Sequence, residues 1–487
     1  MADSIPLGQS TKPEVLFLRL ANRHGLVTGA TGTGKTVTLQ TLAEGFSKAG
    51  VPVFAADIKG DLSGIAMAGE AKDFITARLN QMGVTDWTPE ASPVIFWDLF
   101  GEQGHPVRTT ITEMGPLMLS RLMDLSEAQE GALNIAFRIA DEEGLALLDM
   151  ADLRAMLADL ADRGSSIRTQ YGNVTAATIG AIQRALIVLE EQGGNHFFGE
   201  PALDIREFLR TTRDGRGMVN LLAADKLMQS PRLYATFLLW LLSELFEELP
   251  EAGDPDRPRL VFFFDEAHLL FDDAPKGLVE KVEQVVKLVR SKGVGVYFVT
   301  QNPIDIPDSV LSQLGNRVQH ALRAYTPRDQ KAVKVAAETF RANPAFDTET
   351  LITQLGKGEA LVSVLDPQAI PTMVEHTLIL PPTGRIGPIS DAERQTIKNQ
   401  SPVAGLYDVA KDRGSAAEIL AARAKQKAEN AAVLAEAKKK PTKEPESETA
   451  RMARNIATSA GRSVASAIGR QVGQAIIRGV LGSLLRR

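Results

Sequence analysis

The sequence predicts an α/β fold with a mostly parallel sheet and helices on both of its faces. Uncharged apolar runs at 51–56, 260–264 and 293–300 have the length and composition of buried strands. Segments with helical spacing separate these runs, and alternating strands and helices indicate parallel pairing. From about 110 to 210 helical spacing dominates, which predicts a helical insertion within the sheet-forming part of the chain.

Composition limits the class of protein. The chain has 487 residues, enough for about three domains by the usual size of a domain. Its 44% apolar and 23% charged residues are typical of a soluble globular protein. It has no cysteine, which excludes disulfides, zinc–thiolate sites and cysteine catalysis. Residues 1–10 lack the apolar run of a signal peptide, and the apolar run 233–243 is too short for a bilayer. We therefore expect a cytoplasmic protein.

The first functional motif is a glycine-rich loop between a short apolar run at 24–28 and a predicted helix at 37–49. The loop fits G-x-x-x-x-G-K-[ST], the phosphate-binding loop of nucleotide hydrolases. Its residues are Gly29, Ala30, Thr31, Gly32, Thr33, Gly34, Lys35 and Thr36. Strand before and helix after are the context in which this motif binds phosphate, so we predict a nucleotide site here.

Each residue type in this loop has a physical reason. Glycines leave the concave face open, so that backbone N–H groups can approach the phosphates closely. Lys35 adds a point charge at the β- and γ-phosphates, and the Thr36 hydroxyl can occupy one coordination position of Mg²⁺. A nucleotide and Mg²⁺ are therefore the expected ligands.

Further strands and helices follow in order. A strand at 51–57 ends in the polar run Asp57-Ile58-Lys59-Gly60-Asp61, and another is predicted at 93–99. After the helical insertion, sheet character returns at 217–222. Residues 231–248 then predict one long helix with a wide apolar face.

The run 260–264 ends in two acids, Asp265 and Glu266. In a parallel sheet the strand would carry these carboxylates to the edge where the phosphate loop lies. Asp265 is then placed to hold Mg²⁺, and Glu266 to activate the attacking water as a general base. The alternative, an acidic surface turn, is disfavoured by the phosphate loop upstream.

A helix at 278–291 and a strand at 293–300 come next, and the strand ends at Gln301. An amide at this strand end could sense the γ-phosphate, although a capping or turn residue is also common there. Arg317 and Arg323 follow closely. The last predicted strands are 358–365 and 373–380.

The C-terminal part changes in composition. Residues 416–440 are rich in alanine and charge and predict an exposed helix, and 441–448 form a polar linker. From 449 to 487 the chain contains seven arginines and no acid, with apolar residues between them. Such a tail could lie on an anionic membrane, bind nucleic acid, pair with its own copies, or remain solvated.

We divide the chain into a first core part (1–109), the helical insertion (110–210), a second core part (211–385), a helical extension (386–440), and a linker with the basic amphipathic tail (441–487).

The order of the motifs resembles the HerA/FtsK superfamily of RecA-fold motor ATPases, and in particular its HerA-like bacterial branch. The motifs that carry the resemblance are the phosphate loop, Asp-x-Lys-Gly at 57–60, Phe-Phe-Phe-Asp-Glu-Ala-His at 262–268, Thr-Gln-Asn-Pro at 300–303, and Val-Leu-Ser-Gln-Leu-x-x-Arg at 310–317. The segments 178–184 and 196–201 also look like hallmarks of that branch, and the resemblance covers about residues 10–410.

The resemblance implies a RecA-like core in a hexameric ring of identical subunits that moves along DNA. By it, Lys35 and Thr36 take the Walker A roles, Asp265 and Glu266 the Walker B roles, and Gln301 the sensor role. It also implies an arginine finger from the neighbouring subunit, for which Arg317 is our first choice and Arg323 our second.

One feature departs from the family pattern. HerA proper carries a β-barrel before its ATPase core, whereas about two dozen residues precede the phosphate loop here.

The Asp-Glu-Ala-His string also occurs in superfamily-2 helicases, but the Thr-Gln strand end and the lack of an evident second RecA-like domain argue against that class. Two functions stay open from the sequence: a DNA-translocating ATPase, and an ATP-switched scaffold that binds a membrane surface through its tail.

Overall fold

The computed structural model describes residues 3–172, 174–253, 255–271 and 276–439. The chain divides into two units, residues 1–421 and 422–487. Residues 422–439 of the second unit belong to helix α15 (Ala416–Lys439). The predicted linker and basic tail, 441–487, lie outside the described residues. Within the described ranges, no helix has both the length and the apolar character required to span a bilayer.

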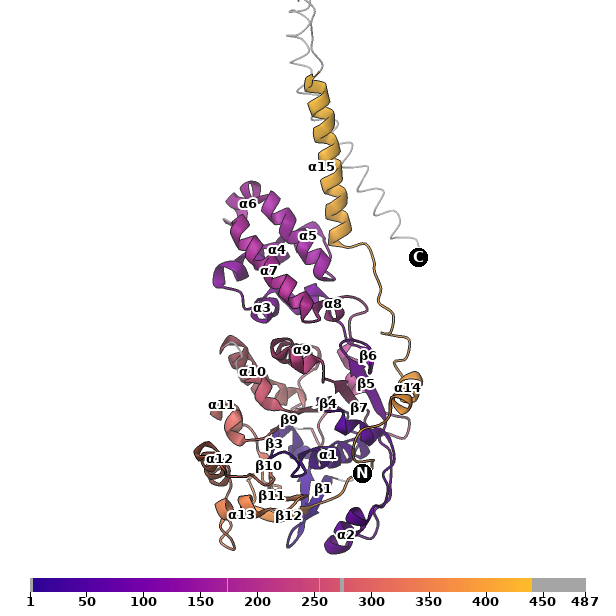
Figure 1. The fold of residues 1–487 in the computed structure, drawn as a ribbon, viewed down its shortest axis with the longest axis vertical. Helices are drawn as coiled ribbons and strands as arrows, with labels where there is room; N and C mark the ends of the chain where they lie inside the picture. The colour runs from indigo at the N-terminus through magenta and orange to yellow at the C-terminus, as the bar shows by residue number, and fades with distance from the viewer. Residues whose placement is uncertain (1–2, 173, 254, 272–275, 440–487) are drawn as a thin grey trace, which may run out of the picture. The chain divides into compact units, whose positions relative to one another are not determined.

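Twelve strands of the described chain form one sheet in the order β2-β1-β12-β11-β10-β3-β9-β8-β4-β7-β5-β6 (Figure 1). The strands are β1 (Ser4–Gln9), β2 (Pro13–Phe17), β3 (Gly25–Thr28), β4 (Val53–Asp57), β5 (Val94–Asp98), β6 (His105–Pro106), β7 (Val219–Ala223), β8 (Leu260–Phe264), β9 (Val294–Thr300), β10 (Asn316–Gln319), β11 (Glu359–Ser363) and β12 (Glu375–Ile379). From β10 to β6 every neighbouring pair is parallel, and from β2 to β10 every pair is antiparallel. The predicted α/β fold with a mostly parallel sheet is confirmed.

Side chains of the central strands alternate between two hydrophobic clusters, one on each face of the sheet. In β8, Phe262 and Phe264 belong to one cluster, while Val261 and Phe263 belong to the other. All five residues of this strand are buried. A strand with both faces covered needs apolar residues at every position, which is why these strands appear in the sequence as continuous apolar runs.

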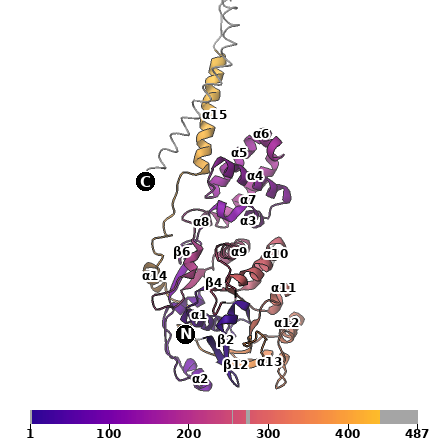
Figure 2. The same cartoon turned by 180° about the vertical axis from the view of Figure 1, so that it is seen from behind.

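Helices cover both faces, as Figures 1 and 2 show from opposite sides. The α-helices are α1 (Lys35–Lys48), α2 (Asp73–Met82), α3 (Ile111–Leu122), α4 (Glu127–Glu143), α5 (Met150–Asp162), α6 (Gly164–Tyr171), α7 (Ala176–Glu191), α8 (Gly194–Phe197), α9 (Pro231–Glu248), α10 (Lys276–Val289), α11 (Asp308–Leu311), α12 (Pro327–Glu338), α13 (Thr348–Gln354), α14 (Asp391–Gln400) and α15. Helix α1 packs in the cluster of Val261, whereas α9 and α10 pack in the cluster of Phe262.

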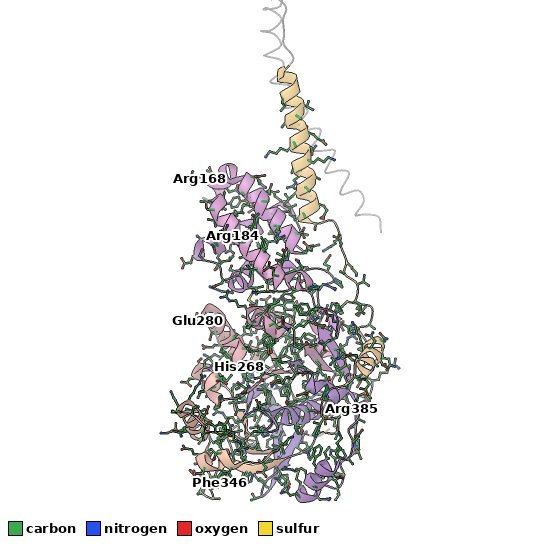
Figure 3. All side chains as sticks on the ribbon, viewed as in Figure 1. Arg168, Arg184, His268, Glu280, Phe346 and Arg385 are labelled. Atoms are coloured by element: carbon green, nitrogen blue, oxygen red, sulfur yellow. The ribbon has the colours of Figure 1, made fainter. Side chains whose placement is uncertain are left out.

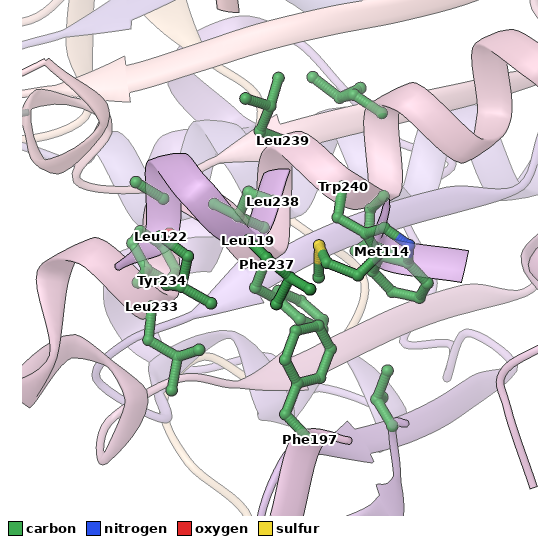
Figure 4. Packing of buried hydrophobic residues seen from close by; sticks show 14 of the residues in the cluster. Met114, Leu119, Leu122, Phe197, Leu233, Tyr234, Phe237, Leu238, Leu239 and Trp240 are labelled. Carbon is green, nitrogen blue, oxygen red and sulfur yellow. The ribbon is translucent and has the colours of Figure 1, made fainter. Parts of the chain in front are cut away.

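Helix α9 joins the sheet to helices α3–α8, which fill the predicted insertion. Eleven of its eighteen residues are buried, so the helix is apolar around most of its circumference. Phe237 and Trp240 of α9 contact the ring of Phe197 from α8, and Met114 of α3 belongs to the same cluster (Figure 4). The hydrophobic core is therefore continuous from the sheet through α9 into α3–α8.

Most predicted elements lie within a few residues of the observed ones. Four strands were not predicted from the sequence: the two strands of the N-terminal hairpin β1–β2, the two-residue β6, and β10. Strand β10 is four residues long and contains Arg317, so periodicity gives it little signal. Its position beside β3 is important for the site, because it places the chain after Gln319 next to the phosphate loop.

Candidate nucleotide-binding site

The predicted phosphate loop, Gly29–Thr36, connects the carboxyl end of β3 to the start of α1. Gly32 and Gly34 have φ values of 79° and 122°, which residues with a Cβ rarely adopt. A Cβ at Gly29 would lie 2.5 Å from the Cβ of His320. A loop of this kind before a helix N-terminus offers backbone N–H groups to an anion.

Lys35 lies at the first position of α1, and its ammonium turns back into the loop. Its Nζ donates to the carbonyl oxygen of Gly29 at 2.6 Å and to that of Ala30 at 3.3 Å. Burial lowers the pKa of Lys35, while the nearby Glu266 and Asp265 act in the opposite direction. The lysine is therefore within electrostatic reach of both acids that the sequence analysis proposed.

These two acids follow β8, which is separated from β3 by β9 alone. Asp265 accepts a hydrogen bond from the backbone N–H of Glu266 at 2.9 Å. Burial, with the neighbouring Glu266, raises the pKa of Asp265 to about 6. A partly buried carboxylate beside a phosphate loop fits Mg²⁺, which proteins hold with one or two carboxylates together with phosphate oxygens and water. Asp265 and the Thr36 hydroxyl are the residues that would hold it.

That donor set suits Mg²⁺ better than a transition metal. Among the described residues there is no group of three or more histidine, cysteine, aspartate or glutamate side chains arranged to hold a metal ion. A Mg²⁺ site shared with a substrate's phosphates needs only the ligands named above.

Glu266 has a left-handed backbone with φ 46° and ψ 49°, and donors from several elements surround its carboxylate. Lys59 Nζ, from the turn after β4, lies 2.8 Å from Oε1. Gln301 Nε2, at the end of β9, and His268 Nδ1 each lie 3.5 Å from Oε2. His268 is labelled in Figure 3. Burial alone would raise the pKa of Glu266, but Lys59 and these partners bring it below its usual value.

The two candidate finger arginines differ in their surroundings. The guanidinium of Arg317 donates to three carbonyl oxygens of its own chain, at 2.9 Å to Leu311, 3.0 Å to Leu314 and 3.0 Å to Thr339. Arg323 is exposed and donates to the carbonyl of Thr353 at 2.7 Å. Arg317 is therefore bonded within its own chain, whereas Arg323 lies at the surface. The finger role of either arginine stays a prediction.

His320 is a residue at the site that the sequence analysis missed. It follows β10 and is buried, and its Nε2 lies 2.8 Å from Thr38 Oγ1 of α1. Its Nδ1 lies 2.9 Å from the carbonyl oxygen of Glu359. Burial lowers the pKa of His320 to about 4. A neutral ring thus joins three segments behind the phosphate loop, and nothing in a single sequence pairs residues 38, 320 and 359.

This burial predicts acid sensitivity. The pKa of His320 is about 4 in the folded protein and close to the usual 6.5 in the unfolded chain. The neutral ring therefore contributes to the free energy of unfolding above pH 6.5, and this contribution is lost as the pH falls from about 6.5 to about 4. The difference in pKa corresponds to about 3 kcal/mol. In urea unfolding followed from pH 7 to pH 4, His320→Gln should lose less stability on acidification than the wild type. The exposed His196→Gln serves as the control, and an equal acid loss in wild type and His320→Gln would contradict the assignment.

A cavity of about 350 Å³ lies beside the loop, on the flank away from the acids. Gly34 and Val37 line it together with Phe74 and Arg78 of α2 and residues next to β11 and β12. In the sheet, β10, β11 and β12 lie on one side of β3 and β8 lies on the other. Phosphates that point toward β8 would place the base of a nucleotide toward this cavity. Phe74 is 59% exposed there and offers a ring face for stacking.

Comparison with protein families matches residues 3–487 to the family described as helicase HerA-like C-terminal. Part of the chain is similar to a probable helicase of Methanocaldococcus jannaschii, with 30% identity over 154 residues, or 30% of this chain and 28% of the relative. Another match is the DNA double-strand break repair helicase HerA of Pyrococcus furiosus, with 29% identity over 126 residues, or 25% of this chain and 20% of the relative. The matched segments span less than a third of either relative.

Solved structures share the fold at low identity. The plasmid coupling protein TrwB, in complex with the ATP analogue ADPNP, has a TM-score of 0.55 and 16% identity over 79% of this chain and 91% of its own. VirB4 of Thermoanaerobacter pseudethanolicus has a TM-score of 0.50 and 16% identity over 78% of this chain and 96% of its own. Identities this low establish the fold alone, which is the RecA-like arrangement that the resemblance implied.

Proposed function

The chain belongs to the helicase HerA-like C-terminal family, and from this premise we propose that it is an ATPase that hydrolyses ATP between the subunits of a ring to move or remodel DNA. The observation that carries the proposal is the grouping of a phosphate loop, a basic Lys35 and the acids Asp265 and Glu266 at one edge of the sheet. The helicase names of two relatives support DNA as the polymer.

The residues have distinct roles in the proposed reaction. Backbone N–H groups of the phosphate loop and the Lys35 ammonium bind the β- and γ-phosphates. Mg²⁺ bound by Thr36 and Asp265 would neutralise charge between these phosphates. Glu266 takes a proton from water as the water oxygen attacks the γ-phosphorus, and the bond from phosphorus to the bridging oxygen of ADP breaks. Gln301 is close enough to Glu266 to orient that water.

A second subunit completes the proposed site. The transition state spreads charge over the γ-phosphoryl oxygens, and an arginine supplied by a neighbour stabilises it. The exposed Arg323 lies two residues after Ala321, whose carbonyl accepts the N–H of Ala30 at 2.8 Å. It therefore lies at the edge of the sheet that holds the phosphate loop. An exposed guanidinium at this edge can contact the nucleotide of a subunit packed against it.

Glu266→Gln tests the proposed chemistry. The amide keeps the shape of the side chain but cannot take the proton, so we expect hydrolysis to slow by about 10²–10⁴-fold while ATP binding remains. Phosphate release and binding of a fluorescent ATP analogue measure the two properties separately. Glu102→Gln, on the exposed loop after β5, is the matched control. Loss of binding with unchanged single-turnover hydrolysis would contradict the general-base role.

A further inference from the structure

Two lysine ammonium groups lie at the candidate site, and each donates to an oxygen of the protein. Lys35 Nζ donates to carbonyl oxygens of the phosphate loop, at 2.6 Å to that of Gly29. Lys59 donates to Glu266 Oε1 at 2.8 Å. Both lysines are within electrostatic reach of Asp265 and Glu266. Lys35 has a role in the phosphate loop, whereas Lys59 lies outside that loop and contacts the proposed general base.

The Lys59–Glu266 pair conflicts with the task of a general base. An ammonium that donates to Oε1 occupies a position that a water proton would need, and its charge makes the carboxylate a weaker proton acceptor. The pair is also asymmetric, because the side chain of Lys59 is 51% exposed and that of Glu266 is 8% exposed. The lysine can therefore turn away without moving a buried element, while the glutamate cannot.

The remaining contacts would keep Glu266 in place if Lys59 left. Gln301 Nε2 and His268 Nδ1 both face the other carboxylate oxygen, Oε2, at 3.5 Å. Oε1 would then be open to water, with the carboxylate still oriented from its other side. Gly60, which follows Lys59, has a φ of 75° and open space where a Cβ would be, so packing at this turn does not restrict a change in the lysine's direction.

We propose that Lys59 is a positioning residue that exchanges partners, passing from Glu266 to the terminal phosphate of the bound nucleotide. This rests on the proposed function, since it requires a nucleotide on the phosphate loop. The γ-phosphate carries more negative charge than the carboxylate and competes for the same ammonium. The exchange frees Glu266 Oε1 when a substrate is present and adds a cation where charge develops, so that turnover is coupled to correct loading of the site.

The exchange has a consequence for binding that does not depend on catalysis. If nucleotide binding must break the Lys59–Glu266 pair, the pair opposes binding, and weakening it should raise affinity. Glu266→Gln replaces the carboxylate by a neutral amide, so Lys59 should pass to the phosphate at a lower cost. The gain should disappear when Lys59 is also replaced, because it arises from this pair alone.

A double-mutant cycle on affinity tests the exchange. The dissociation constant of the non-hydrolysable analogue ADPNP with Mg²⁺ is measured for the full chain, Glu266→Gln, Lys59→Met and the double variant. We expect Glu266→Gln to bind about 5-fold more tightly than the wild type, the size expected of an ion pair with one exposed partner. In the Lys59→Met background Glu266→Gln should change the affinity by less than about 2-fold. Lys59→Arg keeps the charge and should preserve the gain.

The ion pair of Lys226 and Glu102, on loops after β7 and β5, is the matched control. Both partners are exposed. Lys226→Met and Glu102→Gln should each leave ADPNP affinity unchanged, in the wild type and in the Lys59→Met variant alike. The exchange would be overturned if Glu266→Gln changed ADPNP affinity equally with and without Lys59, or if Glu266→Gln bound ADPNP more weakly than the wild type. Neither result would contradict the proposed ATPase. Binding of ADPNP that is indifferent to Lys35→Ala would overturn both, so the two failures can be told apart.

Discussion

Replacing Lys35 with alanine is expected to remove ATP turnover and leave the fold intact. The ammonium contacts the Gly29 and Ala30 carbonyls within the phosphate loop and takes no part in the hydrophobic clusters, so its removal costs little packing. Its loss deprives the β- and γ-phosphates of a cation in a partly buried site. Removing one such preorganised group from a site typically costs about 10²–10³-fold in rate.

Phosphate release, with circular dichroism as the test of folding, measures this effect. Lys48→Ala is the matched control, because Lys48 ends the same helix and pairs with Glu90 at 3.1 Å on the surface. The control should hydrolyse ATP like the wild type. Near wild-type turnover by a folded Lys35→Ala protein would show that the phosphates bind elsewhere.

The second large effect is expected from Arg323→Ala, which should reduce turnover by about 10³–10⁵-fold if this side chain is the finger. Arg317→Ala should act differently. It leaves three carbonyl oxygens without their guanidinium donor, so we expect a lower unfolding midpoint as its main effect. Comparing turnover per folded protein for the two variants separates a catalytic arginine from a structural one.

Mixing subunits tests whether the arginine acts across an interface. Arg323→Ala subunits keep Glu266, and Glu266→Gln subunits keep Arg323, so one mixed interface combines both intact groups. We expect partial activity on mixing two preparations that are each nearly inactive. Failure to recover activity, or full activity of monomeric protein at high dilution, would contradict a site shared between subunits.

The fold could be predicted to the extent that burial imposes a local pattern. Strand β8 is covered on both faces and therefore reads as an unbroken apolar run, and α9 is buried around most of its surface and reads as a long apolar helix. Strands β1, β2 and β10 lack such a signal. Strand β10 is short and contains Arg317, whose guanidinium donates to the carbonyl oxygens of Leu311, at the end of α11, and of Thr339, just after α12.

The site likewise contains residues that local sequence motifs predict and residues that they do not. The phosphate loop and the Asp265–Glu266 pair are each contiguous in sequence, and the sheet brings them to one edge because parallel strands end together. The family that these motifs resemble is also the family that the whole chain matches. Lys59 was visible within the Asp-x-Lys-Gly motif but without a role, because its partner lies 207 residues away. The place of His320 likewise follows from contacts between distant segments.

The most direct test of the account is the rate of phosphate release from Mg²⁺-ATP by the full chain, with and without duplex DNA, at low and at high salt. We predict Mg²⁺-dependent turnover that duplex DNA stimulates at low salt, with the stimulation falling steeply as salt rises because the polymer's phosphates are the contacts. Glu266→Gln protein should show neither the basal nor the stimulated rate. Wild-type turnover no higher than that of Glu266→Gln, or turnover indifferent to DNA at low salt, would contradict a DNA-directed ATPase at this site.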